Sequence, residues 1–447
     1  MEAKERYLAL FEQERRGAGN EPAWLRRLRE AGIARFAELG FPTTRHEEWK
    51  YMDVRPIANL ACAPVAAHGE GPHLNGLGTG SIEPFLLNGL DHCRLIFVNG
   101  HYSPELSSHC GLPQGVTVAS LAAAIADDSE LVQQHLGRYA PFESEAFTAL
   151  NTAFLQDGAF IHIPNGIVIE EPIHLLFVTT SSETPSLTHP RNLILVGDNS
   201  QVTLIESYVS PTHDTYFANA VTEIVAGKNA VLDHYKVELE SDAAFHIGTM
   251  QVQQDRNCNF FSHSFSFGGR LARNNATAVM GGEGIECTLN GLYVVTGEQL
   301  IDNHTVMDHA QPHCHSYELY AGVLDGRGRG VFNGKIFVRQ DAQKTDAIQS
   351  NRSLLLSPDA EVDTKPQLEI FADDVKCTHG ATVGQLDEDA LFYLCTRGIT
   401  PNTARDLLTH AFADDIIERV KVEPLRAQLE QELFNRLSRS RQAITGS

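Results

Sequence analysis

Hydrophobic and polar positions follow two different periods along the 447-residue chain. In about the first 55 residues, apolar positions recur every three or four residues, as on one face of a helix, until Gly40 and Pro42 end the run. From about residue 158 to 373, Val, Ile, Thr, Phe and Tyr dominate between Gly and Asn, which is typical of strands joined by turns. The helical spacing returns from Leu386 onward. The pattern therefore predicts a central β region between two helical regions.

This change of texture divides the chain into three parts. We expect residues 1–157 to form a mostly helical N-terminal region, in which the Gly-, Pro-, His- and Ala-rich stretch 61–80 is a flexible loop. Residues 158–383 should form the β core, and residues 384–447 a C-terminal helical domain. Within that last domain Thr400 can cap a helix that has proline at its first position.

The β region also carries an internal repeat. Strand-like runs of similar length, each opened by a turn residue, begin at Asn199, Asn229, Asn257 and Gly284, at intervals of 30, 28 and 27 residues. A period of this length points to a solenoid or a propeller, and the longer signature repeats of propellers are absent. A sandwich would show tighter hairpins, whereas the coils of a parallel β-helix fit the interval. The pattern alone leaves the parallel β-helix and the sandwich both open.

One helix of the C-terminal domain has an apolar stripe, made of Leu407, Leu408, Ala411 and Phe412. The stripe is more apolar than a small appendage needs for its own packing, so it is a candidate docking face for a partner. The alternative is that it packs against the preceding helix.

Charge and cysteine usage restrict the partners and the compartment. With 35 Lys and Arg against 57 Asp and Glu, the formal charge is −22, which disfavours nucleic acid and anionic membrane surfaces as partners. The charged N-terminus lacks the apolar segment of a signal peptide, and no stretch of 18 apolar residues could span a membrane. The eight cysteines are scattered without a CxxC motif, as in a reduced, cytoplasmic protein.

The sequence contains no catalytic signature. The P-loop, the GxSxG elbow, the HExxH motif and a GxGxxG loop after a strand are all absent, and no residue stands out as a nucleophile or as half of an acid–base pair. We therefore expect a non-catalytic protein that does not bind ATP through a P-loop.

Two clusters could bind a metal. His304, Asp308, His309, His313, Cys314 and His315 fall within twelve residues, but their spacing matches none of the usual zinc motifs. The alternative is a polar row on a sheet face in which the histidines are hydrogen-bonded. In the second cluster, Cys377 and His379 would project to the same side of an extended segment, which suits a pair of ligands. Two ligands make half a site, and a structural thiol beside a satisfied histidine is the alternative.

The motifs around this second pair resemble the SufB/SufD family of the SUF machinery for iron–sulfur cluster assembly, and its SufD-type members in particular. The most specific stretch is 360–398, with Lys376-Cys377-Thr378-His379-Gly380 at its centre. Further matches lie at 45–51, 261–265, 330–334 and 343–346. The position of the cluster cysteine of SufB-type members falls near Asn351, and the chain has no cysteine between Cys314 and Cys377. This departure favours the SufD type.

The resemblance implies a right-handed parallel β-helix flanked by N-terminal and C-terminal helical regions. It implies a scaffold complex in which a SufB-type paralogue pairs side by side with this chain, and a SufC-type ABC ATPase binds its C-terminal helices. His379 is then a ligand facing the SufB-type partner, with Cys377 as a weaker second candidate. The cargo is a transient iron–sulfur cluster or iron shared with that partner, with no cofactor tightly bound by the isolated chain. Homodimerisation of the isolated chain stays open.

A second hypothesis is a β-helix enzyme that acts on polysaccharides. Such enzymes cleave in a groove lined with carboxylates, and the acidic residues here show no paired spacing. The chain also shows no secretion signal that would bring it to polymer substrates. The scaffold hypothesis is therefore the stronger of the two.

Overall fold

The computed structural model describes residues 3–17, 21–64, 79–90, 92–109, 111–127, 129–180 and 184–445. Most of the stretch 61–80, which the sequence predicts to be a flexible loop, lies outside these residues. None of the described helices is long and apolar enough to cross a membrane.

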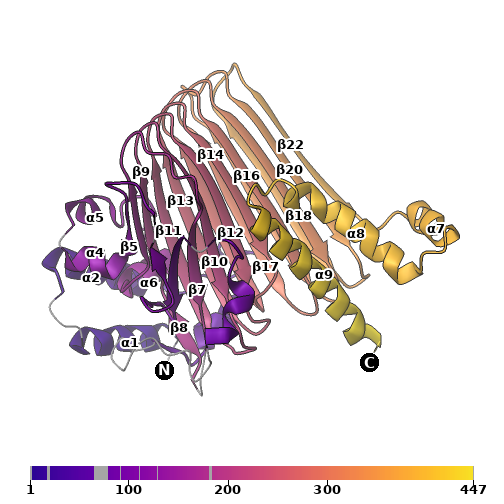
Figure 1. Ribbon diagram of the computed structural model, residues 1–447, viewed down its shortest axis with the longest axis horizontal. Helices are drawn as coiled ribbons and strands as arrows, with labels where there is room; N and C mark the ends of the chain where they lie inside the picture. Colours follow the sequence, from indigo (N-terminus) through magenta and orange to yellow (C-terminus); the bar gives the residue numbers. More distant parts are fainter. Residues whose placement is uncertain are drawn as a thin grey trace.

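Two long sheets stack face to face along most of the molecule (Figure 1). The chain alternates between them, so each coil adds one strand to each sheet, and strands in successive coils pair in parallel. The prediction of a mainly β fold built as a parallel solenoid is confirmed: it has about 8 turns and helices at both ends. The sandwich is thereby excluded.

The first sheet contains β6 (Ala159–Ile163), β9 (Arg191–Val196), β11 (Phe217–Ala226), β13 (Phe245–Gln254), β15 (Leu271–Met280), β17 (Leu300–His309), β19 (Arg329–Val338) and β21 (Glu361–Ile370), with the short β1 (Ala63–Pro64) and β8 (Ser186–Thr188) beside it. The second sheet contains β7 (Ile173–Val178), β10 (Gln201–Val209), β12 (Val231–Leu239), β14 (Asn259–Ser266), β16 (Glu286–Val295), β18 (His315–Leu324), β20 (Asp346–Leu355) and β22 (Lys376–Gly384).

The repeat in the sequence marks one turn of each coil. Asn199, Asn229 and Asn257 have φ angles of 56°, 56° and 57°, in the left-handed region that asparagine and glycine tolerate best. The side-chain amide of Asn229 donates to Oδ1 of Asn199 at 2.9 Å, and that of Asn257 donates to Oδ1 of Asn229 at 3.0 Å. Gly284 continues the left-handed position one coil further. The period of the sequence is thus the repeat of a stacked turn.

The N-terminal region covers the first coils. It contains α1 (Ala3–Gly17), α2 (Ala23–Leu39), η1 (Glu47–Trp49), α3 (Arg55–Asn59), η2 (Thr79–Ser81), η3 (Glu83–Phe85), α4 (Leu121–Ala126), α5 (Glu130–His135) and α6 (Ala146–Ala153). It also extends both sheets. β5 (Thr117–Ser120) pairs antiparallel with β6, and β2 (Cys93–Val98) pairs with β7 and with the short β3 (His101–Tyr102) and β4 (Ser108–His109).

One piece of this region reaches far along the solenoid. The ring of Trp49 in η1 lies 3.8 Å from the guanidinium carbon of Arg273 in β15, and Arg273 also donates to the backbone carbonyl of Glu48 at 2.6 Å. Glu47 forms an ion pair with Lys365 of β21. The short helix η1 therefore bridges several coils on the outer face of the first sheet.

The opposite outer face is covered by the C-terminal helices. The chain forms α7 (Glu388–Thr396), α8 (Pro401–Ile417) and α9 (Glu423–Thr445). We call α8 and α9 together the C-terminal strap, because their apolar residues share one core cluster with the outward side chains of the second sheet. Lys421, between the two helices, pairs with Asp233 of β12 at 2.8 Å and donates its backbone N–H to the hydroxyl of Tyr235. Beyond the strap, α7 projects away from the solenoid (Figure 1).

The last coil, formed by β21 and β22, is open. Each of these strands pairs on one side only, with β19 and with β20. No residue of either strand is fully buried. In the part of the chain that the structure describes, neither the flanking helices nor another strand covers this end, so its backbone N–H and C=O groups offer a free sheet edge.

Candidate functional site at the open end

Cys377 and His379 lie on β22, the last strand of the second sheet. Their neighbours in register on β20 are Ala347 and Gln349. Cys377 packs against the apolar core inside the solenoid, and because alternate residues of a strand share a face, His379 belongs to the same inner face. The sequence-predicted pair is therefore placed together at the mouth of the solenoid.

The two side chains differ in their readiness to bind a metal. His379 is exposed, and the structure holds it at the uncovered end of the sheet. Cys377 is half-buried, and burial, followed by the charge of Asp346, raises the pKa of its thiol. Because the thiolate is the ligand form of cysteine, a raised pKa makes Cys377 the weaker donor. Among the described residues, no group of three His, Cys, Asp or Glu side chains converges as a metal site. The pair is thus at most half of a coordination sphere.

The longer cluster predicted from sequence, His304 to His315, does not converge. His304 lies on the outer face of β17, where its ring nitrogens pair with Asp302 at 3.0 Å and with Glu48 at 3.3 Å. His309 faces the interior, bonds to the hydroxyl of Ser316 at 2.9 Å, and has its pKa lowered to about 4 by burial. The alternative from sequence, hydrogen-bonded histidines along a sheet, therefore describes these two residues.

The other members of that cluster are also apart. His313 occupies the left-handed position of its turn, with a φ angle of 61°. The thiol of Cys314 is buried and donates to the carbonyl of Gly282 at 3.3 Å. Asp308 forms an ion pair with Arg339 at 2.6 Å, and His315 is exposed at the start of β18.

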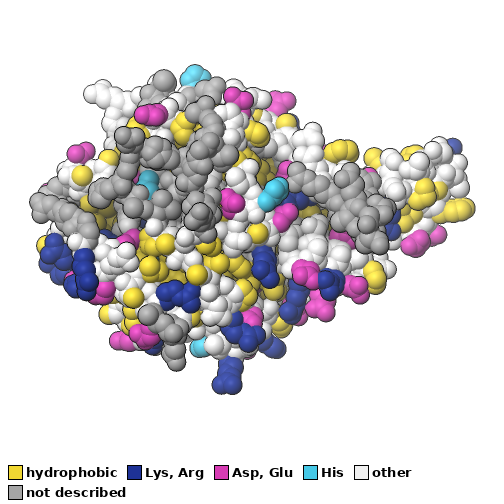
Figure 2. Space-filling model, turned by 90° about the horizontal axis from the view of Figure 1, so that it is seen from below, with side chains coloured by type: hydrophobic (Ala, Val, Ile, Leu, Met, Phe, Trp, Pro, Cys, Tyr) yellow, Lys and Arg dark blue, Asp and Glu magenta, His cyan; other side chains and the backbone are white. Residues whose placement is uncertain are grey.

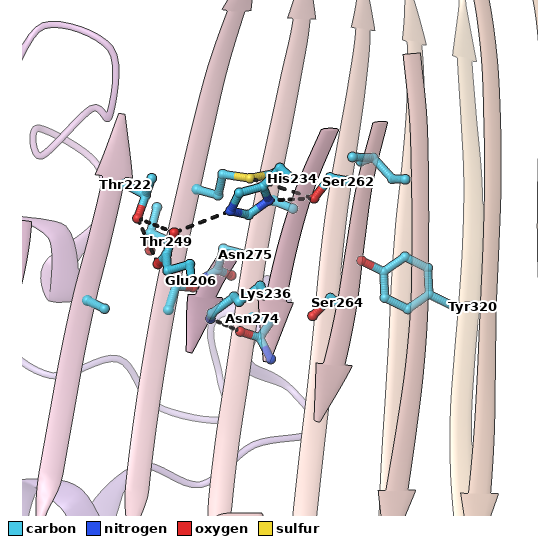
Figure 3. A pocket seen from close by; sticks show the side chains of 15 residues that line it. Glu206, Thr222, His234, Lys236, Thr249, Ser262, Ser264, Asn274, Asn275 and Tyr320 are labelled. Atoms are coloured by element: carbon cyan, nitrogen blue, oxygen red, sulfur yellow. Dashed lines mark hydrogen bonds and ion pairs between the residues drawn. The ribbon is translucent and has the colours of Figure 1, made fainter. Parts of the chain in front are cut away.

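A polar chamber inside the solenoid was not predicted from the sequence. Figure 3 shows it between the two sheets, and its cavity of about 30 Å³ has room for about one or two water molecules. Residues of β10, β12, β13, β14 and β15 contribute most of its lining, among them Glu206, His234, Lys236, Gly248, Ser262 and Asn274.

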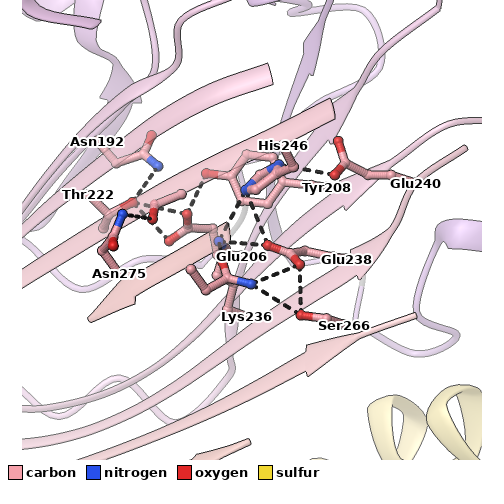
Figure 4. Close-up of polar contacts among 12 residues, drawn as sticks. Asn192, Glu206, Tyr208, Thr222, Lys236, Glu238, Glu240, His246, Ser266 and Asn275 are labelled. Carbon is pink, nitrogen blue, oxygen red and sulfur yellow. Dashed lines mark hydrogen bonds and ion pairs between the residues drawn. The ribbon is translucent and has the colours of Figure 1, made fainter. Parts of the chain in front are cut away.

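Ion pairs compensate the charges at one end of the chamber. The ammonium of Lys236 lies 2.8 Å from Glu238, and His246 bridges Glu238 at 3.1 Å and Glu240 at 3.0 Å (Figure 4). Ser266 donates to Glu238 at 2.7 Å. Burial would raise the pKa of Glu238, but Lys236 and His246 outweigh it and lower the pKa to about 2. Glu238 is therefore a buried carboxylate that stays ionised.

Glu206 is the centre of the other end. His234 lies 3.3 Å from its carboxylate and Thr222 donates to it at 2.9 Å (Figure 3), and the hydroxyl of Tyr208 also donates to it (Figure 4). Although burial acts in the opposite direction, His234 and its other partners lower the pKa of Glu206. Because the charged groups of the chamber pair with one another, they form a closed network and not an open ligand set.

The sequence did carry a signal for this chamber. His234, Lys236 and Glu238 alternate along one strand-like run, so they share one face. Charged residues on alternate positions are usually on the solvent side of a strand, and here that side is the interior of the solenoid.

The apolar stripe of α8 is divided between packing and exposure. Phe412 is half-buried and packs against the core cluster that the strap shares with the second sheet, whereas Leu407 has 48% of its surface exposed. Leu408 is half-buried and Ala411 is exposed. The projecting α7 adds two aromatic residues that the sequence reasoning did not assign to docking: Phe392 is 71% exposed and Tyr393 is 56% exposed. Figure 2 shows hydrophobic side chains on the surface of this arm.

Comparison with known protein families accounts for nearly the whole chain. Residues 177–412 match the family described as "SUF system FeS cluster assembly, SufBD core domain", and residues 1–175 match the "SufBD protein N-terminal region". The chain belongs to the SufBD family. The Cys377 and His379 pair at the open end and the projecting α7 arm are thus features of a SufBD protein, a component of iron–sulfur cluster assembly.

Individual SufBD relatives are similar over most of their length. An iron–sulfur cluster assembly SufBD family protein of Synechocystis is 35% identical over 93% of this chain and 91% of its own. The iron–sulfur cluster assembly protein SufD of Escherichia coli is 32% identical over 91% of both chains. SufD of Bacillus subtilis is 27% identical over 92% of this chain and 93% of its own.

Proposed function

We propose that this chain is the SufD-type subunit of a SUF scaffold complex, and that its open last coil pairs with a SufB-type paralogue to build a nascent iron–sulfur cluster between them. The observation that carries this proposal is the position of His379 on a strand whose outer edge has no partner among the described residues. A cluster site shared between two chains requires each chain to present some of the ligands at an edge that the other chain can reach, and His379 lies at such an edge.

A partner at this end would pair the open backbone groups and would cover exposed apolar side chains. The outer edges of β21 and β22 have unpaired backbone groups, and a partner strand can hydrogen-bond to them. Large apolar side chains are exposed nearby, among them Ile348, Phe371 and Val383. A partner chain that covers them would also bring the remaining ligands, since one cluster usually takes four.

The ATPase partner would bind elsewhere. This chain has no P-loop, so the nucleotide chemistry belongs to a SufC-type subunit. The exposed residues Phe392 and Tyr393 lie on the α7 arm, which follows β22 and projects away from the solenoid, and Leu407 lies on the adjoining part of α8 (Figure 1). We propose this surface, with the α8 stripe, as the docking face of that ATPase.

In this role the chain is a scaffold and not an enzyme. Its described polar clusters form closed networks, and no disulfide joins the described cysteines to one another, which suits a reducing cytoplasm. The iron and sulfide of the cluster are cargo that passes through the complex.

Cluster assembly in the complex tests the proposal. The chain is co-expressed with a SufB-type and a SufC-type protein, the complex is isolated anaerobically, and bound iron and sulfide are measured after reconstitution. His379→Ala should remove most of the bound cluster without dissociating the complex, because a single interface side chain rarely holds a large heterodimer together. Cys377→Ser should have a smaller effect, because the thiol of Cys377 is half-buried and has a raised pKa.

His315→Ala is the matched control, since His315 is an exposed histidine of the same sheet that lies away from the open edge. Normal cluster content in the His379→Ala complex would remove this residue from the mechanism. Failure of the three chains to co-purify would contradict the scaffold role itself, and size-exclusion chromatography of the isolated chain would show whether the open ends pair with each other instead.

A further inference from the structure

The inner face of the second sheet arranges its side chains in columns, one residue per coil. The column that ends in His379 is set by the strand register and contains Leu204, His234, Ser262, Leu289, Glu318, Gln349 and His379. Leu289 separates the polar chamber from the last three members. Glu318, Gln349 and His379 are therefore a separate polar file that leads from the interior to the open end.

The first link in this file is a hydrogen bond inside the solenoid. The side-chain amide of Gln349 donates to Oε2 of Glu318 at 2.6 Å. Both side chains are at most 1% exposed. Gly334 of β19 leaves the space for this contact, because a Cβ there would lie 2.4 Å from Nε2 of Gln349. The pair is thus built into the packing of the interior.

The bond fixes which end of the Gln349 amide faces outward. An ionised carboxylate only accepts hydrogen bonds, so the NH₂ group of Gln349 must face Glu318 and its carbonyl must face away. Burial raises the pKa of Glu318 to about 7, so the group is ionised at pH 8. No described residue donates a hydrogen bond to Oε1 of Gln349. A buried carbonyl without a donor costs free energy, so a donor that reaches Oε1 of Gln349 would be stabilised there.

We propose that Oε1 of Gln349, held in place by Glu318, accepts the ring N–H of His379 and so leaves the other ring nitrogen of His379 free to bind metal at the open end. His379 is the next residue in register, on a strand that lies about 4.8 Å from β20, and it belongs to the same inner face. Metal-binding histidines usually donate their second N–H to such an acceptor, which fixes the tautomer and the ring orientation. Gln349 and Glu318 are thus positioning residues, and this role rests on the proposed function of His379.

The tautomer of His379 tests this arrangement in the isolated full-length chain. Histidines are labelled with ¹⁵N and ¹³C, the His379 signal is assigned by its loss in His379→Asn, and ring-nitrogen shifts are measured at pH 8. His315, which is exposed, serves as the internal reference. In the wild type one tautomer of His379 should dominate, and in Gln349→Met, which keeps the size but removes the acceptor, the tautomer ratio should change by about fivefold toward that of His315.

Three further variants separate positioning from packing. Gln349→Glu retains an acceptor oxygen, because the two carboxyl groups can share one proton, so it should restore the wild-type tautomer. Glu318→Met frees the Gln349 amide to turn, so the bias should weaken although Gln349 is intact. Ser350→Ala, on the outward face of the same strand, should change nothing. Circular dichroism confirms folding, and if Gln349→Met does not fold, Gln349→Glu and Glu318→Met provide the comparison.

Equal tautomer ratios in the wild type and Gln349→Met would overturn the proposal, as would a Gln349→Glu variant that resembles Gln349→Met. These outcomes do not depend on cluster assembly. If His379 is a ligand but the hydrogen bond to Gln349 does not form, only this inference fails. If the hydrogen bond forms but the His379→Ala complex assembles clusters normally, only the proposed function fails.

Discussion

Lys236 is the residue on which the charge balance of the interior depends. Its ammonium contacts Glu238 and lies 3.2 Å from His246, and Gly248 leaves the space that it occupies, since a Cβ there would lie 2.2 Å from Nζ. Replacing a whole buried ion pair by apolar residues is often tolerated, whereas removing one partner leaves an uncompensated charge. The network is therefore most sensitive to single substitutions.

We expect Lys236→Met to lower the free energy of unfolding by about 3–5 kcal/mol, because Glu238 loses its nearest cation. The double variant Lys236→Met/Glu238→Gln should recover part of this loss. Guanidinium unfolding of both variants and of Glu238→Gln alone completes a double-mutant cycle. A single variant within about 1 kcal/mol of the wild type would mean that His246 alone balances Glu238.

Among the elements, the stacked turns explain how much of the fold could be predicted. Asn199, Asn229 and Asn257 are visible in the sequence because a left-handed turn position restricts the residue type, and such a position recurs once per coil. The period does not say which strands pair, because a sandwich and a solenoid can use the same turns. Only the resemblance to the SufB/SufD family decided between them.

The candidate site was predictable to a similar degree. Cys377 and His379 alternate on one strand, so their common face follows from the sequence. Gln349 and Glu318 are 30 and 61 residues earlier, and only the register of the coils brings them into one file with His379. The clustered spacing from His304 to His315 was misleading for the reverse reason, because a strand and a turn send neighbouring side chains to different faces.

The C-terminal helices give a prediction about docking. Leu407→Asp should weaken binding of the SufC-type ATPase at least about tenfold and leave stability unchanged, because Leu407 is exposed. Phe412→Asp should abolish binding altogether. Because Phe412 also packs against the core cluster shared by the strap and the second sheet, this variant should lower the free energy of unfolding as well. Binding is measured by titration calorimetry and stability by thermal unfolding.

Ala427, an exposed alanine of the neighbouring helix α9 outside the stripe, provides the matched control as Ala427→Ser, which should bind normally. If Leu407→Asp and Phe412→Asp both bind the ATPase with unchanged affinity, the docking face lies elsewhere. If Phe412→Asp unfolds while Leu407→Asp binds normally, the stripe serves packing alone.

For the whole molecule, buried titratable groups set the response to acid. Burial lowers the pKa of His174 and His189 to about 3, and it is the main cause that lowers those of His263 and His309 to about 4. Burial also raises the pKa of Glu14 and Glu318 to about 7. Between pH 6.5 and 4.5, the four histidines bind protons only in the unfolded state, and the two glutamates bind them only in the folded state. With four histidines against two glutamates, the unfolded state binds about two more protons than the folded state.

Stability should therefore fall as the pH drops through this window, by about 2.7 kcal/mol per pH unit from these groups. Urea unfolding at pH 6.5, 5.5 and 4.5 measures the slope. His309→Gln keeps a donor for the contact with Ser316 but cannot titrate, so it should reduce the slope by about one proton. A flat dependence would show that the glutamates cancel the histidines, and stability that rises toward acid would show that the glutamates outweigh them.

The bridging contacts on the two outer faces have a consequence for the length of the molecule. A solenoid can in principle gain or lose coils freely, because each coil contacts only its neighbours. Here η1 connects the N-terminal region to β21 through Glu47 and Lys365, and the strap is anchored to β12 through Lys421 and Asp233. The segment Glu47–Trp49 contacts both Arg273 of β15 and Lys365 of β21, and these strands are separated by coils that come in steps of about 4.8 Å. An additional coil between β15 and β21 would therefore move Lys365 out of reach of Glu47 while Trp49 stays on Arg273, so the contacts of η1 favour a fixed number of coils between the N-terminal region and the open end.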